Sequence, residues 1–320
     1  MRESDTFLIL TRDFIWTLFV VVKSIITAYF RSFASLSVCF PRRYKDVSQD
    51  IILITGAGRG IGRQIAVEIA KHKPKMIILW GRHKEPLEAT AGVIHLMGVQ
   101  CHFMTCDVSD HEEVYKKADE IRDKYGDVTI CVNNAGVVFG NTILESESEE
   151  ILHAMKVNTA AHFWTTKAFL SAMLENNHGH LVFINSMLGI MGLAGAAEYS
   201  SSKFGSAGFV ETLKLEIANE KKDNVHVTII HPYLVETGMF SGCETRFPSL
   251  FPALDPEYVA WKIVDAILTN SYMVLLPRLM YFMSFVTKFL PIDAIIAIHR
   301  FTGVDVCMDS FHGRKKKKRE

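Results

Sequence analysis

Tyr199 and Lys203 lie four residues apart and are the side chains in this sequence best suited to acid-base chemistry. Four residues is close to one helical turn, so the two side chains lie on one face of a predicted helix. A free tyrosine has a pKa of about 10, and a nearby ammonium group favours the phenolate and lowers that pKa. The pair therefore predicts a tyrosine that acts as general acid towards a carbonyl oxygen or general base towards an alcohol.

Ser186 comes shortly before this pair, at the end of the apolar stretch 181–185, which predicts a buried strand. Its hydroxyl group is placed to hydrogen-bond the same substrate oxygen as the tyrosine. A Tyr-x-x-x-Lys pair also occurs on ordinary helix surfaces, where it has no chemical role. Whether Tyr199 and Lys203 form a catalytic pair therefore depends on the elements that position them.

The first of these elements is a glycine-rich turn between a predicted strand, residues 51–54, and a predicted helix. Gly56, Gly60 and Gly62 carry no Cβ, which leaves backbone N–H groups and the helix N-terminus open to a pyrophosphate. The spacing departs from the commoner Gly-x-Gly-x-x-Gly fingerprint of dinucleotide sites. A purely structural turn is the alternative, and the segments that follow favour a dinucleotide.

The second predicted strand, residues 76–79, leads to Gly81 and Arg82 rather than to an acidic residue. An acidic side chain at this point would bind the ribose hydroxyls of NAD and repel a 2′-phosphate. Arg82, together with Arg59 in the glycine-rich turn, offers cationic donors to a phosphate, although either arginine alone could be a solvated charge. The pattern favours NADP(H) over NAD(H), and Lys203 is long enough to reach the nicotinamide ribose as well.

Two more predicted strands continue the alternation with helices that is typical of a parallel α/β sheet with right-handed crossovers. The strand over 101–106 leads to Asp107 and Val108, which are suitably placed for the edge of an adenine. The strand over 128–132 leads to the segment Asn133-Asn134-Ala135-Gly136. We therefore expect the cofactor to lie across the ends of these strands.

Composition limits the other functions. The 320 residues are 49% hydrophobic, which is enough for one large α/β domain with short extensions. Lys plus Arg and Asp plus Glu both number 35, which gives no reason to expect nucleic acid as a partner. The six cysteines are scattered and are most simply free thiols in a reducing compartment. His178 and His180 have no carboxylate at ligand spacing, so we predict no metal site.

The N-terminal segment is apolar over residues 14–22 and again over 25–30, with Lys23 between the two runs. A membrane-spanning helix needs about 20 mostly apolar residues, which this segment reaches if Lys23 extends to the interface. A cleaved signal peptide is disfavoured because no small-residue cleavage site follows. We predict an uncleaved anchor, spanning or lying on the membrane, with the basic residues after it placing the catalytic body in the cytosol.

The C-terminal segment 279–298 is apolar but is interrupted by Lys288, Pro291 and Asp293, which argues against a clean span. Packing on a membrane surface is favoured, and docking on the domain or on a dimer partner is the alternative. The basic tail, residues 314–319, is a solvated end, a contact for anionic lipids, or a dilysine endoplasmic-reticulum signal through Lys317 and Lys318. We expect three parts: an anchor over 1–45, a catalytic domain over 46–276, and an extension over 277–320.

Taken together, these motifs resemble the short-chain dehydrogenase/reductases over about residues 50–276. The resemblance implies a doubly wound, seven-stranded parallel Rossmann sheet in three α/β/α layers, and a homodimer formed through the helices that carry Asn158 and Tyr199. It also implies that Asn158 anchors a water in the proton relay from Lys203. The family's Pro-Gly after the sixth strand is Pro232-Tyr233 here, which is expected to reshape the pocket floor, while Thr237 keeps a nicotinamide contact.

The site residues implied by the motifs and the resemblance fall into two groups. The catalytic group is Asn158, Ser186, Tyr199 and Lys203. The cofactor group comprises Thr55, Gly56, Arg59, Gly60, Ile61, Gly62, Gly81, Arg82, Asp107, Val108, Asn134, Ala135, Gly136, Tyr199, Lys203, Pro232 and Thr237.

A narrower resemblance, over residues 79–82, 162–170, 236–240, 246–252 and 299–314, is to the membrane-bound retinoid branch of the family. It implies NADP(H)-dependent reduction of all-trans-retinal to all-trans-retinol at the endoplasmic reticulum membrane, or on lipid droplets. A 17-beta-hydroxysteroid or another lipid alcohol is the alternative substrate, and a non-catalytic lipid-droplet or partner-binding protein is the alternative of another class. Apolar residues after the strand ends suit a lipophilic substrate: Met187, Leu188, Leu193, Met239, Phe240, Phe247, Leu250 and Phe251.

Overall fold

The computed structural model describes residues 12, 14–23, 43–243, 246–248 and 252–313. The chain divides into two compact units, one ending at Tyr44 and the other beginning at Lys45. Residues 14–23 of the first unit form a helix. Within the part of the chain that the structure describes, no helix is both long and apolar enough to cross a membrane. The second apolar run of the predicted anchor, 25–30, and the basic tail lie outside the described residues.

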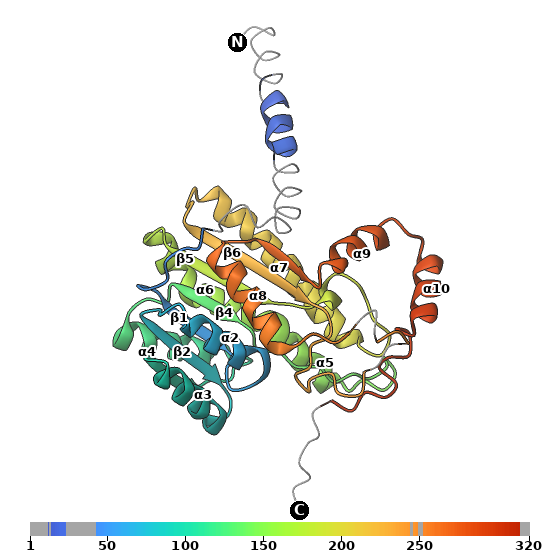
Figure 1. The fold of residues 1–320 in the computed structure, drawn as a ribbon, viewed down its shortest axis with the longest axis horizontal. Coiled ribbons are helices and arrows are strands. Elements are labelled where there is room, and N and C mark those ends of the chain that lie inside the picture. The colour runs from blue at the N-terminus through green and yellow to red at the C-terminus, as the bar shows by residue number, and fades with distance from the viewer. Residues whose placement is uncertain (1–11, 13, 24–42, 244–245, 249–251, 314–320) are drawn as a thin grey trace, which may run out of the picture. The chain divides into compact units, whose positions relative to one another are not determined.

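The second unit is built on one parallel sheet of seven strands in the order β3-β2-β1-β4-β5-β6-β7 (Figure 1). The central strands are buried along their whole length, as their continuous apolar sequences require in a sheet covered on both faces. This confirms the predicted fold class. The strands are β1 (Ile51–Thr55), β2 (Met76–Gly81), β3 (Cys101–Thr105), β4 (Ile130–Asn133), β5 (Gly179–Ile184), β6 (Val225–Pro232) and β7 (Met273–Leu276).

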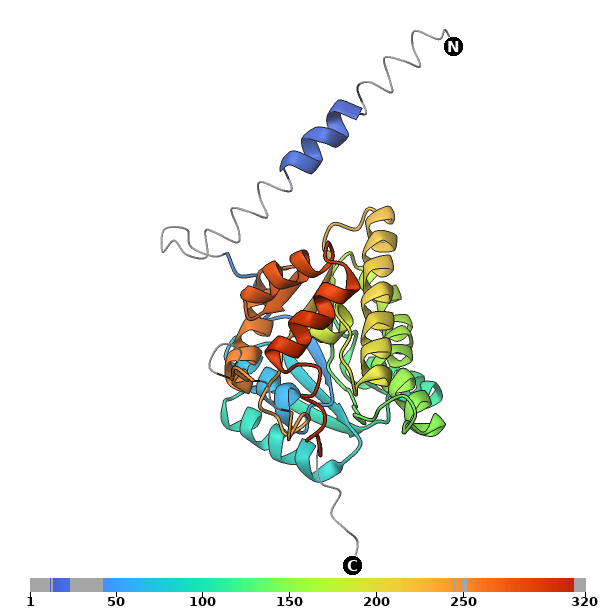
Figure 2. The ribbon, with the colours of Figure 1, turned by 90° about the vertical axis from the view of Figure 1, so that its right-hand side faces the viewer.

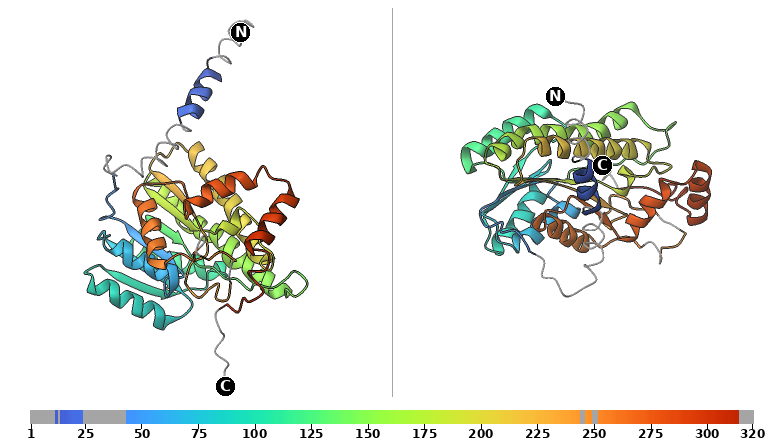
Figure 3. Two further views of the ribbon diagram at one scale, coloured as in Figure 1. Left: turned by 45° about the vertical axis from the view of Figure 1, so that its right-hand side comes forward. Right: turned by 90° about the horizontal axis from the view of Figure 1, so that it is seen from above.

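Helices pack on both faces of the sheet and give three layers, which are clearest in the right-hand view of Figure 3. One hydrophobic core lies between the sheet and α2, α3 and α8, and a second lies between the sheet and α4, α6 and α7. The helices of these layers are α2 (Gly60–Ala70), α3 (Lys84–Leu96), α4 (His111–Tyr125), α5 (Ser148–Met155), α6 (Ala161–Glu175), α7 (Ala197–Asn219) and α8 (Pro256–Leu268).

Strand order reverses between β1 and β4, which pair in parallel with Ile54 opposite Val132. In sheets of this type the crevice for a ligand opens at such a reversal, outside the carboxyl ends of the strands. The glycine-rich turn leaves β1 at this edge, and the segment Asn134 to Gly136 leaves β4 beside it. The fold therefore brings together two stretches that are distant in the sequence.

The C-terminal extension folds as two further helices, α9 (Leu279–Thr287) and α10 (Ile292–Thr302), followed by a segment of turns. Met280 of α9, and Cys307 and Met308 after α10, are buried against the domain. Figures 1 and 2 show both helices at the periphery of the unit, away from the two main helical layers. The helix α9 and the segment after α10 thus pack on the catalytic domain, whereas α10 itself contains no buried residue.

Candidate active site

The glycine-rich turn has the geometry that its sequence predicts for a phosphate cradle. Gly56 and Gly60 have φ angles of +65° and +56°, a region that residues with a Cβ rarely adopt. A Cβ on Gly62 would lie 2.5 Å from the carbonyl oxygen of Gly56. Thr55 lies beneath the turn, where its Oγ1 accepts hydrogen bonds of 3.0 Å from the backbone N–H groups of Asn134 and Ala135. The turn is therefore tied to the end of β4 and leaves its outer side open.

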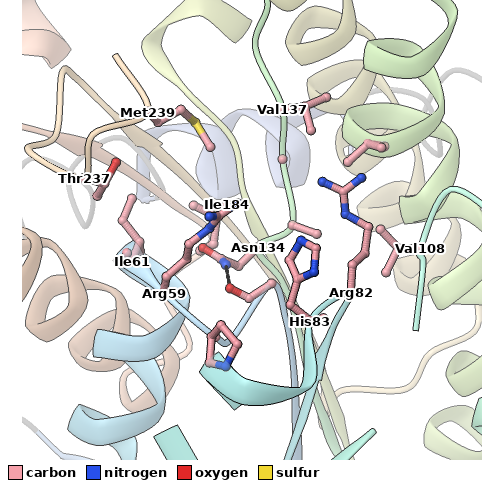
Figure 4. Close-up of a pocket in the computed structure, with 18 of the residues that line it drawn as sticks. Arg59, Ile61, Arg82, His83, Val108, Asn134, Val137, Ile184, Thr237 and Met239 are labelled. Carbon is pink, nitrogen blue, oxygen red and sulfur yellow. Dashed lines mark hydrogen bonds between the residues drawn. The ribbon is translucent and has the colours of Figure 1, made fainter. Parts of the chain in front are cut away.

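A cavity lies over this turn and receives side chains from the ends of five strands (Figure 4). Asn134 lies between Arg59 and Arg82 in this view, with Thr237 and Met239 above Arg59 and Val108 beside Arg82. The Nδ2 of Asn134 donates to the carbonyl oxygen of Thr55 at 2.9 Å. The predicted cofactor residues that line the cavity are Gly56, Arg59, Gly60, Ile61, Gly81, Arg82, Asp107, Val108, Asn134, Ala135, Gly136, Tyr199, Lys203 and Thr237.

The electrostatics of the cavity suit an anionic ligand. The N-terminus of α2 opens into it, and the first turn of that helix contains no acidic residue. Arg59 and Arg82 are both exposed at its rim, and Asp107 is the one carboxylate among its described lining residues. Burial opposes ionisation of Asp107, but hydrogen bonds from the backbone and side chain of Ser109 lower its pKa below the ordinary value. The residues present therefore fit the phosphate groups of a nicotinamide dinucleotide.

The acid-base pair lies at the inner end of the same cavity, on α7. Tyr199 is buried and its phenol shares a hydrogen bond with the hydroxyl group of Ser186. The Nζ of Lys203 lies 5.6 Å from the centre of the Tyr199 ring and donates to the carbonyl oxygen of Ile184 at 3.0 Å. The Ser186 Oγ also accepts from the backbone N–H of Leu188 at 3.1 Å, which fixes its position at the start of the short helix η2 (Met187–Gly189). The structure thus brings together the three groups that the sequence singled out.

Burial sets the proton affinities of this pair. It raises the pKa of Tyr199 to about 12, although the Ser186 hydrogen bond works in the opposite direction. It lowers the pKa of Lys203 to about 8. The sequence predicted a lowered tyrosine pKa, and that prediction was wrong for this structure because desolvation of the phenol, together with the nearby Glu198 carboxylate, outweighs the hydrogen bond with Ser186. At neutral pH the tyrosine is protonated, which suits a general acid.

Asn158 lies in a single π-helical turn, η1 (Lys156–Ala160), between α5 and α6. Turns of this kind occur frequently at functional sites. Its Oδ1 accepts from the backbone N–H of Val137 at 2.9 Å, and its Nδ2 donates to the Val137 carbonyl at 2.8 Å and to Ser202 at 2.9 Å. Asn158 therefore connects the segment after β4 to the helix of the acid-base pair.

A second cavity, which is apolar, adjoins the first on the side of Ser186. Its described lining contains no Asp, Glu, Lys or Arg, and includes four methionines, one from η2, one from the following loop and two from α9. Tyr233, the departure from the family's glycine, lies in its wall, and burial raises the pKa of this tyrosine to about 12. Of the apolar residues predicted for substrate, those that line this cavity are Met187, Leu188, Leu193 and Phe240.

The two cavities meet at the hydrogen bond between Tyr199 and Ser186. Tyr199 lines the polar cavity and Ser186 the apolar one. The ring of Tyr199 also contacts Phe240, in the wall of the apolar cavity, at 5.4 Å between centroids. A carbonyl group at this junction would reach both hydroxyl groups while its apolar remainder stays out of water.

Some of the predicted site residues do not line the cavity that the sequence assigned to them. Thr55 and Gly62 support the turn and do not line the cofactor cavity, and Pro232 lines the apolar one. Met239, predicted for substrate, lies in the cofactor cavity. Phe247 contacts Phe301 instead of either cavity, and positions 250 and 251 lie outside the described residues.

The sequence also missed part of the site. The walls that α9 and α10 contribute to the apolar cavity carried no motif, and their helical spacing is the one signal that could have indicated them. They are Met280, Met283, Thr287, Ile295, Ile298, His299 and Thr302.

The histidines considered for metal binding have structural partners. The Nε2 of His178 lies 2.7 Å from a carboxylate oxygen of Asp50. The ring of His180 is bonded to Lys45 at 2.8 Å and Thr228 at 2.7 Å. Among the residues with described positions, no group of three or more His, Cys, Asp or Glu side chains could hold a metal ion.

A seven-stranded parallel sheet with a glycine-rich turn at its reversal point and a Tyr-Lys pair beside it defines a nicotinamide-dependent oxidoreductase. The family model of the short chain dehydrogenases matches residues 50–246, and the chain belongs to this family.

Among curated relatives, the chain is similar to Short-chain dehydrogenase/reductase 3 of Homo sapiens, with 42% identity over 281 residues, 88% of this chain and 92% of the relative. It is 41% identical to human Epidermal retinol dehydrogenase 2 over 285 residues, 89% of this chain and 92% of the relative. It is 40% identical to Retinol dehydrogenase 10 of Rattus norvegicus over 299 residues, 85% and 87% of the two chains. The predicted resemblance to the retinoid branch is thereby confirmed.

Two solved structures also match the fold. An alcohol dehydrogenase from the archaeon Thermococcus sibiricus, complexed with 5-hydroxy-NADP, has a TM-score of 0.63 and 26% identity, and covers 71% of this chain and 96% of its own. An actinorhodin polyketide ketoreductase with NADPH has a TM-score of 0.62 and 28% identity, with 71% and 95% covered.

Proposed function

We propose that this protein is an NADP(H)-dependent reductase of a lipophilic carbonyl, and that its substrate is all-trans-retinal, which it converts to all-trans-retinol. The observation that carries the proposal is the hydrogen bond between Tyr199 and Ser186 at the junction of a polar cavity and an apolar one. A non-catalytic binding protein would need neither the junction nor the buried Lys203 behind it.

The proposed chemistry divides between cofactor and chain. A bound nicotinamide would supply the hydride to the carbonyl carbon. Tyr199 donates its proton to the carbonyl oxygen as negative charge develops there, and its raised pKa keeps that proton in place at neutral pH. Ser186 donates a second hydrogen bond to the same oxygen. The ammonium group of Lys203 then stabilises the phenolate that Tyr199 becomes.

Tyr199 serves as acid in reduction and as base in oxidation, and the direction of turnover follows the ratio of reduced to oxidised cofactor. Preference for NADP(H) is supported by Arg59 and Arg82 at the rim and by the absence of an acidic residue directly after β2. The two matched structures named above were solved with NADP(H)-type cofactors.

A retinoid substrate is supported by two observations. Relatives that are 40–41% identical across most of both chains are named retinol dehydrogenases. The apolar cavity beside Ser186 has a lining rich in methionine, which adapts to elongated apolar ligands. The same lining would accept a 17-ketosteroid, which is the second substrate to be tested.

We place the protein at the endoplasmic reticulum membrane with its catalytic domain in the cytosol. The apolar sequence of residues 14–22, the basic residues that follow it and the free cysteines of the described residues support this location. We also propose a homodimer through α6 and α7. These helices expose Phe163 and Phe204 by 44% and 45%, and Leu215 by 64%.

The proposal is tested by NADPH consumption in membranes that contain the protein, with all-trans-retinal and a 17-ketosteroid supplied separately. Tyr199→Phe is the matched control, since it removes one oxygen and keeps the ring. Turnover that depends on retinal and on the tyrosine supports the proposal. Turnover of the steroid alone overturns the substrate, and full activity of Tyr199→Phe overturns the assigned acid.

A further inference from the structure

The helix α9 has apolar side chains on two opposite sides, and α10 carries exposed apolar side chains beside those that line the apolar cavity. The inner side lines the apolar cavity through residues such as Met283 of α9 and Ile298 of α10. The outer side exposes large apolar residues that have no role in that cavity. They are Phe282 (63% exposed), Phe285 (64%), Phe289 (73%), Ile292 (67%) and Phe301 (66%).

Phe282, Phe285 and Phe289 follow one another at helical spacing, on one side of α9 and just past its end. Phe285 and Phe289 lie one turn apart, with ring centroids 4.9 Å from each other. Single exposed apolar residues are ordinary on protein surfaces. A continuous group of large ones on an otherwise soluble domain marks a surface that contacts something apolar. Figure 2 shows α10 on the side of the domain that faces the viewer.

The charges around this surface indicate what covers it. Arg278, Lys288 and Arg300 are exposed on or beside the two helices, against Asp293 on α10 and Asp305 and Asp309 in the turns that follow it. The sequence then continues into six consecutive basic residues at 314–319. Aromatic and aliphatic side chains flanked by cations are the composition of helices that lie in the interface of an anionic membrane.

The position of α9 and α10 beside the apolar cavity indicates a function for their exposed apolar surface. The helices that expose the outer residues also form one wall of the cavity that ends at Ser186. An apolar medium in contact with the outer side is therefore separated from the cavity by the thickness of these two helices. A lipophilic molecule that enters between them passes from lipid to the catalytic group without crossing water.

We propose that α9 and α10 lie in one leaflet of a phospholipid membrane and form the entrance through which the substrate reaches the active site. The occupant of the outer surface is lipid, and the basic side chains contact its phosphate groups. The identity of the molecule that enters rests on the proposed function, whereas the insertion of the helices does not.

Insertion is tested with the full chain in vesicles of phosphatidylcholine and phosphatidylserine that contain brominated acyl chains, which quench nearby tryptophan fluorescence. Phe285→Trp and Phe289→Trp each add one fluorophore to the wild-type background. Leu96→Trp is the matched control, because Leu96 is 91% exposed at the end of α3, far from these helices in the sequence. We expect added quenching at 285 and 289 and none at 96. Quenching no greater than that of the control would overturn the proposal.

The entrance is tested by kinetics. We expect the double variant Phe285→Ser, Phe289→Ser to raise the KM for retinal in vesicles by about 10-fold, because membrane contact scales with apolar area. In this double variant the kcat, the KM for NADPH and the turnover of a short water-soluble aldehyde should stay unchanged. The control variant Leu96→Ser should keep all of these constants and the KM for retinal unchanged. An unchanged KM for vesicle-borne retinal refutes the entrance.

The two proposals fail separately. If the wild-type protein does not reduce retinal, the substrate assignment fails while the quenching experiment still decides insertion. If the outer surface instead joins two copies of the chain, quenching is absent and the serine variant lowers the molecular mass in sedimentation. That result would overturn the lipid assignment.

Discussion

Replacing Lys203 by methionine removes the ammonium group behind the catalytic tyrosine and keeps most of the side-chain volume. In the structure this group is buried and lies 5.6 Å from the Tyr199 ring centre. With an effective dielectric constant of about 20, a unit charge at this distance stabilises the phenolate by about 3 kcal/mol. That corresponds to about two pKa units, so we expect kcat for reduction to fall by about 100-fold.

The assay is single-turnover reduction with NADPH in excess, so that product release does not mask the chemical step. The dissociation constant of NADPH is measured in parallel, because Lys203 is also expected to reach the ribose. Burial lowers the pKa of Lys203 to about 8. Above that pH the ammonium group is lost, so wild-type activity should fall as pH rises through about 8, while Lys203→Met lacks this decline.

Lys116→Met is the matched control, because Lys116 is exposed on α4 and lines neither cavity. It should leave both kcat and the pH profile unchanged. The reasoning is refuted if Lys203→Met, with NADPH bound normally, stays within about threefold of wild type. It is refuted equally if the variant keeps the decline near pH 8, since another group must then be responsible.

Three further predictions concern the cofactor cavity and the core. Arg82→Ala should weaken NADPH binding by about 10- to 100-fold and leave NADH binding nearly unchanged in fluorescence titrations, because a charge-assisted hydrogen bond contributes about 1.5–3 kcal/mol. Gly62→Ala should lower the free energy of unfolding by about 1–3 kcal/mol and abolish NADPH binding, because its Cβ would lie 2.5 Å from the Gly56 carbonyl oxygen. Burial lowers the pKa of His162 to about 3 and of His231 to about 4. The unfolded chain therefore binds protons first, and the stability that these two histidines contribute above about pH 6.5 should fall by roughly 6 kcal/mol by pH 4 in denaturant titrations.

The controls follow from the same structure. Arg63→Ala removes an exposed arginine of α2 that does not line the cavity and should leave both cofactors unaffected. Gly92→Ala adds a Cβ in open space on α3 and should be neutral or slightly stabilising. A double variant, His162→Gln with His231→Gln, should reduce the acid dependence without removing it, because burial also lowers the pKa values of His180 and His226. If Arg82→Ala weakens the binding of NADPH and NADH equally, Arg82 does not contact a 2′-phosphate. If the double histidine variant loses as much stability at low pH as the wild type, the two histidines are not the groups that bind protons on unfolding.

Local sequence signals were sufficient for the sheet and the glycine-rich turn. The continuous apolar run 51–54, short and rich in β-branched residues, is typical of a strand covered on both faces, and the glycines after it specify a turn that other residues rarely adopt. The pairing of Tyr199 with Lys203 likewise follows from helical periodicity. These features depend on neighbours in the chain.

Other features depend on what the fold brings into contact. The sequence placed a lysine near the tyrosine and predicted a lowered pKa. The tertiary structure buries the phenol, and desolvation raises its pKa to about 12 instead. Burial is a property of the whole packing, and so the sign of this shift could not be read from spacing.

The sequence by itself determined the family, the alternation of strands and helices along the chain, and the residues of the catalytic group. Each of these is encoded in short contiguous motifs. The tertiary structure alone decided that Tyr199 and Ser186 join two cavities and that α9 and α10 form a wall of the apolar one. Helices rich in apolar residues on several sides can face either a domain or a membrane. Only the packing against Ser186 and its neighbours separates the inner side from the outer one.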